Sequence, residues 1–128
     1  MNIEEYNILQ KNENANQIAI DFDGVIHKNS LGFHDGSVYD EPIEGSLEAI
    51  RKLYDMGYSI VIFTAKAKSD RPLVNGKTGE ELIWEWLEKY NVSQYIKSIT
   101  SEKPRAKYYI DDNAVRFTNW VDVLGLVM

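Results

Sequence analysis

Two short acidic motifs stand directly after apolar segments of this sequence. The first is Asp21-x-Asp23-Gly24, and the second is the pair Asp111-Asp112. Carboxylates crowded at the end of a buried segment are unfavourable unless a cation or hydrogen-bond donors neutralise them. Carboxylate oxygens are the preferred ligands of hard cations such as Mg²⁺. The two motifs together therefore predict a magnesium site.

Each acidic motif also has a simpler interpretation. One acid of the first motif could cap a turn while the other is solvated, with Gly24 making the bend. Asp111-Asp112 could be an acidic turn at the surface. Two acidic motifs after two separate strands favour the shared site, because the carboxyl ends of parallel strands meet at one edge of a sheet.

Two further residues could contact a phosphoryl group at that edge. Thr64 ends an apolar segment, and its hydroxyl can donate a hydrogen bond, although threonine also commonly caps such a turn. Lys103 precedes Pro104, which restricts the backbone on both sides and would help to hold the ammonium group in place. The alternative for Lys103 is a solvated surface side chain.

Strand and helix patterns alternate along the segments that would position these residues. Short apolar runs predict strands over 17–22, 58–64 and 107–110, with a weaker candidate over 95–99. Helical spacing predicts a helix over 47–54, and Thr78 and Glu81 form a capping-box pattern that opens another. This alternation predicts an α/β fold with a doubly wound parallel sheet.

The length and composition of the chain predict a single globular domain. The chain has 128 residues, 44% of them hydrophobic, a formal net charge of −6 and no cysteine. We expect residues 1–16 to be a polar lead-in and residues 17–128 to form the single domain. No apolar run has the length of a membrane span, and we expect no signal peptide. The lack of cysteine fits a cytoplasmic protein, and the negative charge argues against a broad nucleic-acid-binding face.

The order of these motifs resembles that of the phosphatases of the haloacid dehalogenase (HAD) superfamily. The resemblance covers roughly residues 17–118 and is carried by Asp-x-Asp-Gly-Val, Phe-Thr-Ala, Lys-Pro and Tyr-Ile-Asp-Asp in that order. It implies a Rossmann-like, three-layer α/β/α fold of the HAD type. It also implies a Mg²⁺-dependent hydrolase that acts on phosphomonoesters.

The same resemblance implies roles for four residues. Asp21 would be the nucleophile that forms an aspartyl-phosphate, and Asp23 would serve first as general acid and then as general base. Thr64 and Lys103 would hold the phosphoryl oxygens. Dehalogenation is disfavoured, because the second acid and the late acid pair are phosphatase features.

The metal ligands implied by the resemblance come from both acidic motifs. Mg²⁺ would bind the Asp21 carboxylate, the main-chain carbonyl of Asp23 and a carboxylate of the late pair. Asp112 is favoured as the direct ligand and Asp111 as its support, although the sequence does not decide between them.

The resemblance further implies a minimal, capless protein. HAD proteins usually select substrates with an inserted cap, whereas segments 24–42 and 66–78 have room only for loops, the first of them flap-like. Such a site would be open to bulky substrates or covered by formation of a homo-oligomer. The substrate would be a small phosphorylated molecule, for example a nucleotide or a sugar phosphate, or a phosphorylated polymer end.

The two loops hold the candidate substrate-binding residues. Gly24 and Lys66 are assigned to this role, and Lys66, Lys68 and Arg71 could form a basic rim for a second anionic group; the alternative is a solvated loop. The histidines of the first loop could touch substrate, but we expect them to be exposed; they are His27 and His34.

Two other function classes remain open. A catalytically silent binding module would be indicated by substitutions at the key positions, and none is found. A signalling receiver domain also uses an acid cluster, a phosphorylated aspartate, a threonine and a lysine. It carries its phosphoryl-accepting aspartate in mid-chain, whereas the predicted strand that ends at Phe63 has none.

Overall fold

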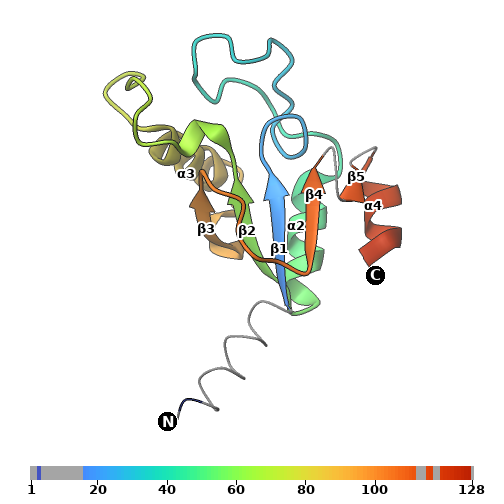
Figure 1. Ribbon diagram of the computed structural model, residues 1–128. Coiled ribbons are helices and arrows are strands. Elements are labelled where there is room, and N and C mark those ends of the chain that lie inside the picture. Colours follow the sequence, from blue (N-terminus) through green and yellow to red (C-terminus); the bar gives the residue numbers. More distant parts are fainter. Residues whose placement is uncertain (1–2, 4–15, 112–114, 117–118, 128) are drawn as a thin grey trace.

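The computed structural model describes residue 3 and residues 16–111, 115–116 and 119–127. Its strands form one parallel sheet in the order β3-β2-β1-β4-β5 (Figure 1). The strands are β1 Gln17–Asp21, β2 Ser59–Phe63, β3 Ile96–Thr100, β4 Tyr108–Asp111 and β5 Val115–Arg116. The four strands predicted from sequence are all present, with ends that differ by a residue or two. The two-residue strand β5 is too short to give a sequence pattern.

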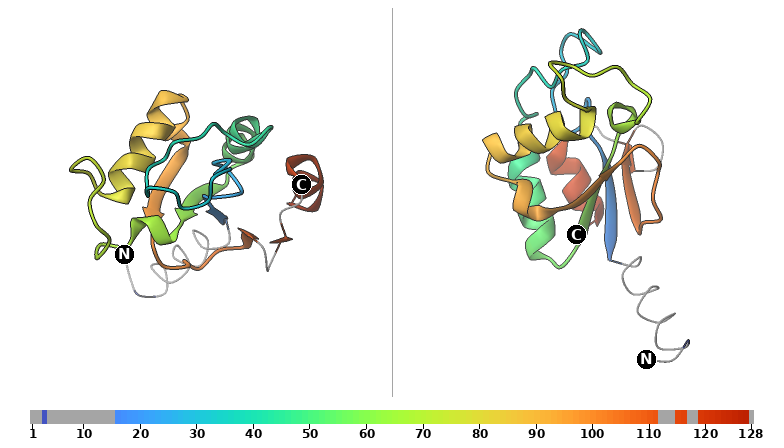
Figure 2. Two further views of the ribbon diagram at one scale, coloured as in Figure 1. Left: turned by 90° about the horizontal axis from the view of Figure 1, so that it is seen from above. Right: turned by 90° about the vertical axis from the view of Figure 1, so that its left-hand side faces the viewer.

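Helices flank this sheet. They are α2 Ser46–Asp55, α3 Gly79–Lys89 and α4 Trp120–Val127, with short 3₁₀ turns η1 Ala65–Ala67 and η2 Ser93–Tyr95. Helices α2 and α3 lie on one face of the sheet, whereas the connection from β3 to β4 crosses the opposite face (Figure 2). The predicted α/β fold with a parallel sheet is therefore confirmed.

The core lies between the sheet and helices α2 and α3. Ile18 and Ile20 of β1 and Ile60 and Ile62 of β2 are fully buried there, because alternate residues of a strand point to the same face. Ala19, which points to the opposite face, is also fully buried. Burial on both faces explains why these strands have continuous apolar sequences.

Local sequence signals place the two central helices. Thr78 accepts a hydrogen bond from the N–H of Glu81, whose side chain accepts from the N–H of Thr78, so the predicted capping box is confirmed. Helix α2 is followed by Gly57, whose φ of 95° lies in the left-handed region that favours glycine. In the loop before α3, Asn75 and Gly76 both have positive φ and form a two-residue turn between Val74 and Lys77.

The strand order places β1 and β4 side by side at the centre of the sheet. The chain adds β2 and β3 on one side of β1, and then β4 and β5 on the other. Ligands of such sheets bind beyond the carboxyl ends of the strands where the order reverses. The loops 24–42 and 68–78 both lie beyond this edge (Figure 1). No helix in the described part of the chain is long and apolar enough to cross a membrane.

Candidate active site

The carboxyl ends of β1 and β4 bring the two acidic motifs to adjacent positions. Ile20 pairs with Ile110, and Asp21 and Asp111 follow these residues directly. Both aspartates therefore point to the sheet face opposite α2 and α3. The Asp111 side chain is buried, and its Oδ2 accepts a hydrogen bond from Lys103 Nζ at 2.8 Å. The structure thus brings Asp21, Asp111 and Lys103 to one edge of the sheet.

The connection that crosses this face holds Lys103 above two aromatic rings. Its Nζ lies 4.8 Å from the ring centroid of Tyr109 and 5.6 Å from that of Phe63. Gln17 fastens the same connection, because its side-chain N–H donates to the carbonyl of Arg105 at 2.7 Å. A cation held over aromatic rings and a carboxylate has a defined position, unlike a freely solvated lysine.

Four of the predicted site residues line one pocket of about 250 Å³. They are Asp21, Asp23, Thr64 and Lys66. The rest of the lining comes from the two loops and from η1; these residues are Asn29, Phe33, Ala65 and Arg71. The hydroxyl oxygen of Thr64 accepts from the N–H of Lys66 at 3.3 Å, so Thr64 caps η1 and lines the pocket as well. Lys103 is not part of this lining.

Asp23 is held by two side chains through the same carboxylate oxygen. Its Oδ1 accepts from His27 Nδ1 at 2.9 Å and from Lys66 Nζ at 3.1 Å. The other ring nitrogen, His27 Nε2, accepts from the backbone N–H of Asp40 at 2.9 Å. A nitrogen that accepts a hydrogen bond carries no proton, so the ring proton is on Nδ1 and points to Asp23.

The expectation of an exposed His27 is wrong. Its ring is fully buried and stacks on Phe22, with the ring centroids 5.3 Å apart and the planes at 10°. The edges of Tyr39 and Trp86 also pack against it. The two hydrogen bonds satisfy both ring nitrogens, which makes burial of this polar ring possible. His34 is exposed, as expected.

The environment of Asp23 keeps its carboxyl group ionised. Partial burial raises the pKa of Asp23, but the hydrogen bond from His27 and the positive charge of Lys66 together lower it further, so the pKa lies below its ordinary value. In this state Asp23 is a carboxylate that can accept a proton.

Lys66 differs from the exposed basic rim that the sequence suggested. Only 4% of its side chain is exposed, and its Nζ also donates to the carbonyl of Ser37 at 3.4 Å. A buried ammonium must be paired, and the partner here is Asp23. Lys66 therefore connects η1, the end of β1 and the loop 24–42. Lys68 is exposed and lies outside the pocket lining, whereas Arg71 lines the pocket.

Close packing at Gly79 gives Lys66 its position. A Cβ atom at Gly79 would lie 1.8 Å from the carbonyl oxygen of Lys66. Only glycine can therefore stand at the first residue of α3 while η1 packs against it. No pattern in the sequence marks this contact, because the two residues belong to different elements.

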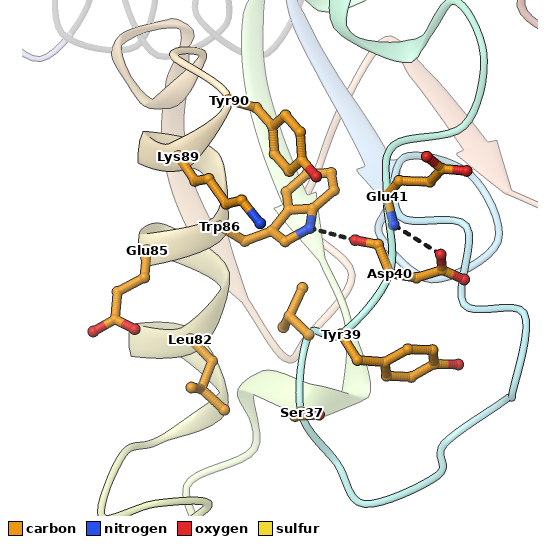
Figure 3. Close-up of a pocket in the computed structure, with 10 residues that line it drawn as sticks. Ser37, Tyr39, Asp40, Glu41, Leu82, Glu85, Trp86, Lys89 and Tyr90 are labelled. Carbon is orange, nitrogen blue, oxygen red and sulfur yellow. Dashed lines mark hydrogen bonds between the residues drawn. The ribbon is translucent and has the colours of Figure 1, made fainter.

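The loop 24–42 is fastened to α3 through Asp40. Trp86 Nε1 donates to the carbonyl of Asp40 at 2.8 Å, and the Asp40 side chain accepts from the N–H of Glu41 (Figure 3). A separate hollow of about 480 Å³ lies between residues 37–41 and α3. None of the aspartates at the strand ends lines it, so it is not the candidate reaction site.

Gly24 makes the turn that follows the first acidic motif. Its φ is 83°, and its N–H donates to the carbonyl of His27 at 2.8 Å. This hydrogen bond uses the Gly24 amide within the turn. Substrate binding by Gly24 stays a prediction.

Comparison with known proteins gives a fold and no function. No protein-family model and no curated protein sequence matches the chain. Among solved structures, the chain is similar to a conserved protein coded by a locus from Bacteroides thetaiotaomicron, with 20% sequence identity and a TM-score of 0.62. The match covers 89% of this chain and 90% of that chain. At this identity the similarity supports the α/β fold alone.

Carboxylate and ammonium groups gather at this edge of the sheet. The Asp23 carboxylate is paired with Lys66 and the Asp111 carboxylate with Lys103, and Asp21 lines the pocket together with Asp23. Carboxylate oxygens on adjacent strand ends are ligands that Mg²⁺ accepts. The described residues contain no group of three His, Cys, Asp or Glu side chains arranged around one ion. The predicted direct ligand, Asp112, lies outside the described residues.

Proposed function

We propose that this chain is a Mg²⁺-dependent phosphomonoester hydrolase of the HAD type that works through an aspartyl-phosphate on Asp21. The carrying observation is that Asp21, Asp23 and Thr64 line one pocket at the carboxyl edge of a parallel sheet. The Lys103–Asp111 pair lies beside them. The three-layer, capless HAD architecture and a cytoplasmic location belong to the same proposal.

The reaction divides into two transfers of one phosphoryl group. A carboxylate oxygen of Asp21 attacks phosphorus and the bond to the leaving oxygen breaks. Asp23, which is ionised before substrate binds, takes a proton from the phosphate monoanion of the substrate and passes it to the leaving oxygen. Asp23, now a carboxylate, then takes a proton from a water molecule that attacks the same phosphorus. The bond between phosphorus and the Asp21 oxygen breaks, which releases inorganic phosphate and restores Asp21.

The hydrogen bonds of Asp23 favour its role in proton transfer. His27 and Lys66 both donate to Oδ1, and among the described residues neither they nor any other group donates to Oδ2. Oδ2 is therefore the oxygen available to carry the proton. His27 acts as a positioning residue, because it fixes the plane of the Asp23 carboxylate without touching the reacting atoms.

The other predicted site residues would stabilise the negative charge of the phosphoryl group. Thr64 would donate its hydroxyl proton to a phosphoryl oxygen, and Lys103 would offset the charge of the phosphoryl group. Asp21, the main-chain carbonyl of Asp23 and the late acid pair would hold Mg²⁺, which neutralises phosphoryl charge when bound.

Hydrolysis of a small aryl phosphate with and without Mg²⁺ tests this proposal. We expect Mg²⁺-dependent turnover that falls by about 1,000-fold or more in Asp21→Asn, because the nucleophile is lost. The matched control is Asp55→Asn, an exposed acid at the end of α2 that lines neither the pocket nor the loops beyond it, which should retain activity. Full activity of Asp21→Asn would show that Asp21 is not the nucleophile. A folded wild type that binds Mg²⁺ without turnover on any phosphomonoester would instead indicate the silent binding module.

A further inference from the structure

Exposed apolar side chains gather on the two loops beyond the candidate active site. Phe33 of the loop 24–42 is 58% exposed, and Leu73 of the loop 68–78 is 60% exposed. These two side chains line the same hollow of about 180 Å³, together with Pro72 and Val74. Clustered exposed apolar side chains next to polar residues commonly mark a binding site.

This hollow adjoins the pocket that Asp21 and Asp23 line. The two share Phe33, Lys66 and Arg71 in their linings. With volumes of about 180 and 250 Å³, they together reach the lower range of small-molecule sites, roughly 300–1,000 Å³. A phosphomonoester whose phosphorus lies at Asp21 would extend its organic part into the neighbouring hollow.

Two planar groups, the Phe33 ring and the Arg71 guanidinium, are among the walls of the hollow. The guanidinium carbon of Arg71 lies 5.3 Å from the ring centroid of Phe33, which places a planar cation beside an aromatic face. Gly36 leaves room for the Phe33 ring, since a Cβ atom at Gly36 would lie 3.2 Å from an atom of that ring. Heteroaromatic bases stack on aromatic side chains and on guanidinium groups.

The same walls suit a sugar less well. A polyhydroxylated body needs hydrogen-bond partners, but the Asp35 carboxylate in the lining already accepts from the N–H and hydroxyl of Ser37. The ammonium group of Lys66 is paired with Asp23. Most of the other lining side chains are apolar.

From these observations we propose that the hollow between Phe33, Arg71 and Leu73 binds the organic part of the substrate, and that this part is a heteroaromatic ring system such as a nucleobase. The inference builds on the proposed hydrolysis of phosphomonoesters. It names Phe33 and Arg71 as residues that determine specificity.

Adenosine 5′-monophosphate and ribose 5-phosphate form a matched pair of probes, because they differ in the base. We expect wild type to have a higher kcat/KM for the nucleotide. Phe33→Ala should lower that kcat/KM about fivefold or more, as loss of one stacking partner predicts, and should change the value for ribose 5-phosphate less than twofold. Arg71→Gln should act in the same direction.

Matched controls come from the same loops. Leu31→Ala removes another exposed apolar side chain, and Lys68→Gln removes another cation; neither residue lines the two hollows. Both variants should keep the wild-type preference. Equal loss of kcat/KM for both probes in Phe33→Ala, or no preference in wild type, would overturn the inference while leaving the hydrolase proposal intact.

A failure of the hydrolase proposal gives a different result. In that case no probe is turned over, including the small aryl phosphate. Calorimetric titration of wild type and Phe33→Ala with the same two probes then decides the inference. The inference is supported if wild type binds the nucleotide more tightly than ribose 5-phosphate and if Phe33→Ala weakens the binding of the nucleotide. Equal binding of the two probes, or no binding, would count against the inference. The exposed side chains of Phe33 and Leu73 would then be a surface for a protein partner.

Discussion

Replacement of Gly79 by alanine tests the packing that places Lys66. The added Cβ would lie 1.8 Å from the Lys66 carbonyl oxygen, whereas real Cβ contacts essentially never fall below 3.0 Å. The start of α3 and η1 must therefore separate by about 1.2 Å. Both partners are backbone, so no side chain can rotate to relieve the clash.

The expected loss of stability is large for so small a change. Overpacking of well-packed sites costs about 1–3 kcal/mol, and we expect about 3 kcal/mol here because the contact is between backbone atoms. For a chain of this length that corresponds to a fall in Tm of about 10 °C. Displacement of Lys66 should also weaken its ion pair with Asp23 and lower kcat for aryl phosphate hydrolysis.

The same substitution at Gly125 is the matched control. Gly125 lies in α4, is exposed, and has no atom within 4 Å of the position of an added Cβ. Gly125→Ala should stabilise the protein by up to about 1 kcal/mol, since alanine favours a helix. Urea unfolding of both variants measures the two effects. If Gly79→Ala is as stable as wild type within about 0.5 kcal/mol, the reasoning about this contact is wrong.

Three further predictions concern the caps and the first loop. Thr78→Ala removes the capping box of α3 and should cost about 1 kcal/mol in urea unfolding; an unchanged midpoint would contradict the role of the cap. His27→Phe keeps the stacked ring but loses the hydrogen bonds with Asp23 and Asp40, so the free energy of unfolding measured by calorimetry should fall by about 3 kcal/mol. An unchanged free energy of unfolding would show that these two hydrogen bonds do not stabilise the fold. Hydrogen bonds from the hydroxyl and N–H of Ser30, and to a smaller extent from the N–H of Glu41, lower the pKa of Asp40 to about 2. The ionised carboxylate therefore stabilises the folded loop above about pH 4, and this stabilisation is lost as the pH falls towards 2. Ser30→Ala should raise this pKa towards 3.8 in an NMR titration, and an unshifted curve would exclude the Ser30 hydroxyl as its cause.

The fold could be predicted because its signals are local. Continuous apolar runs of about five residues indicated the buried strands, and the Thr78–Glu81 capping box marked the start of α3 within one turn. Asp21 and Asp111 could be placed at one edge because parallel strands end together, which is a property of the topology and not of particular contacts.

The amino-acid sequence by itself determined the four longer strands and helices α2 and α3, and that Asp21 and Asp111 end strands at the same edge of the sheet. That these two strands are neighbours was decided by the tertiary structure. Only the tertiary structure decided how Asp23 is held. Its partner Lys66 lies 43 positions away in the chain. Its other partner, His27, is covered by the rings of Tyr39 and Trp86 and accepts a hydrogen bond from the N–H of Asp40. Burial of a polar side chain depends on whether distant groups satisfy each of its hydrogen bonds, and no local pattern of residues records that.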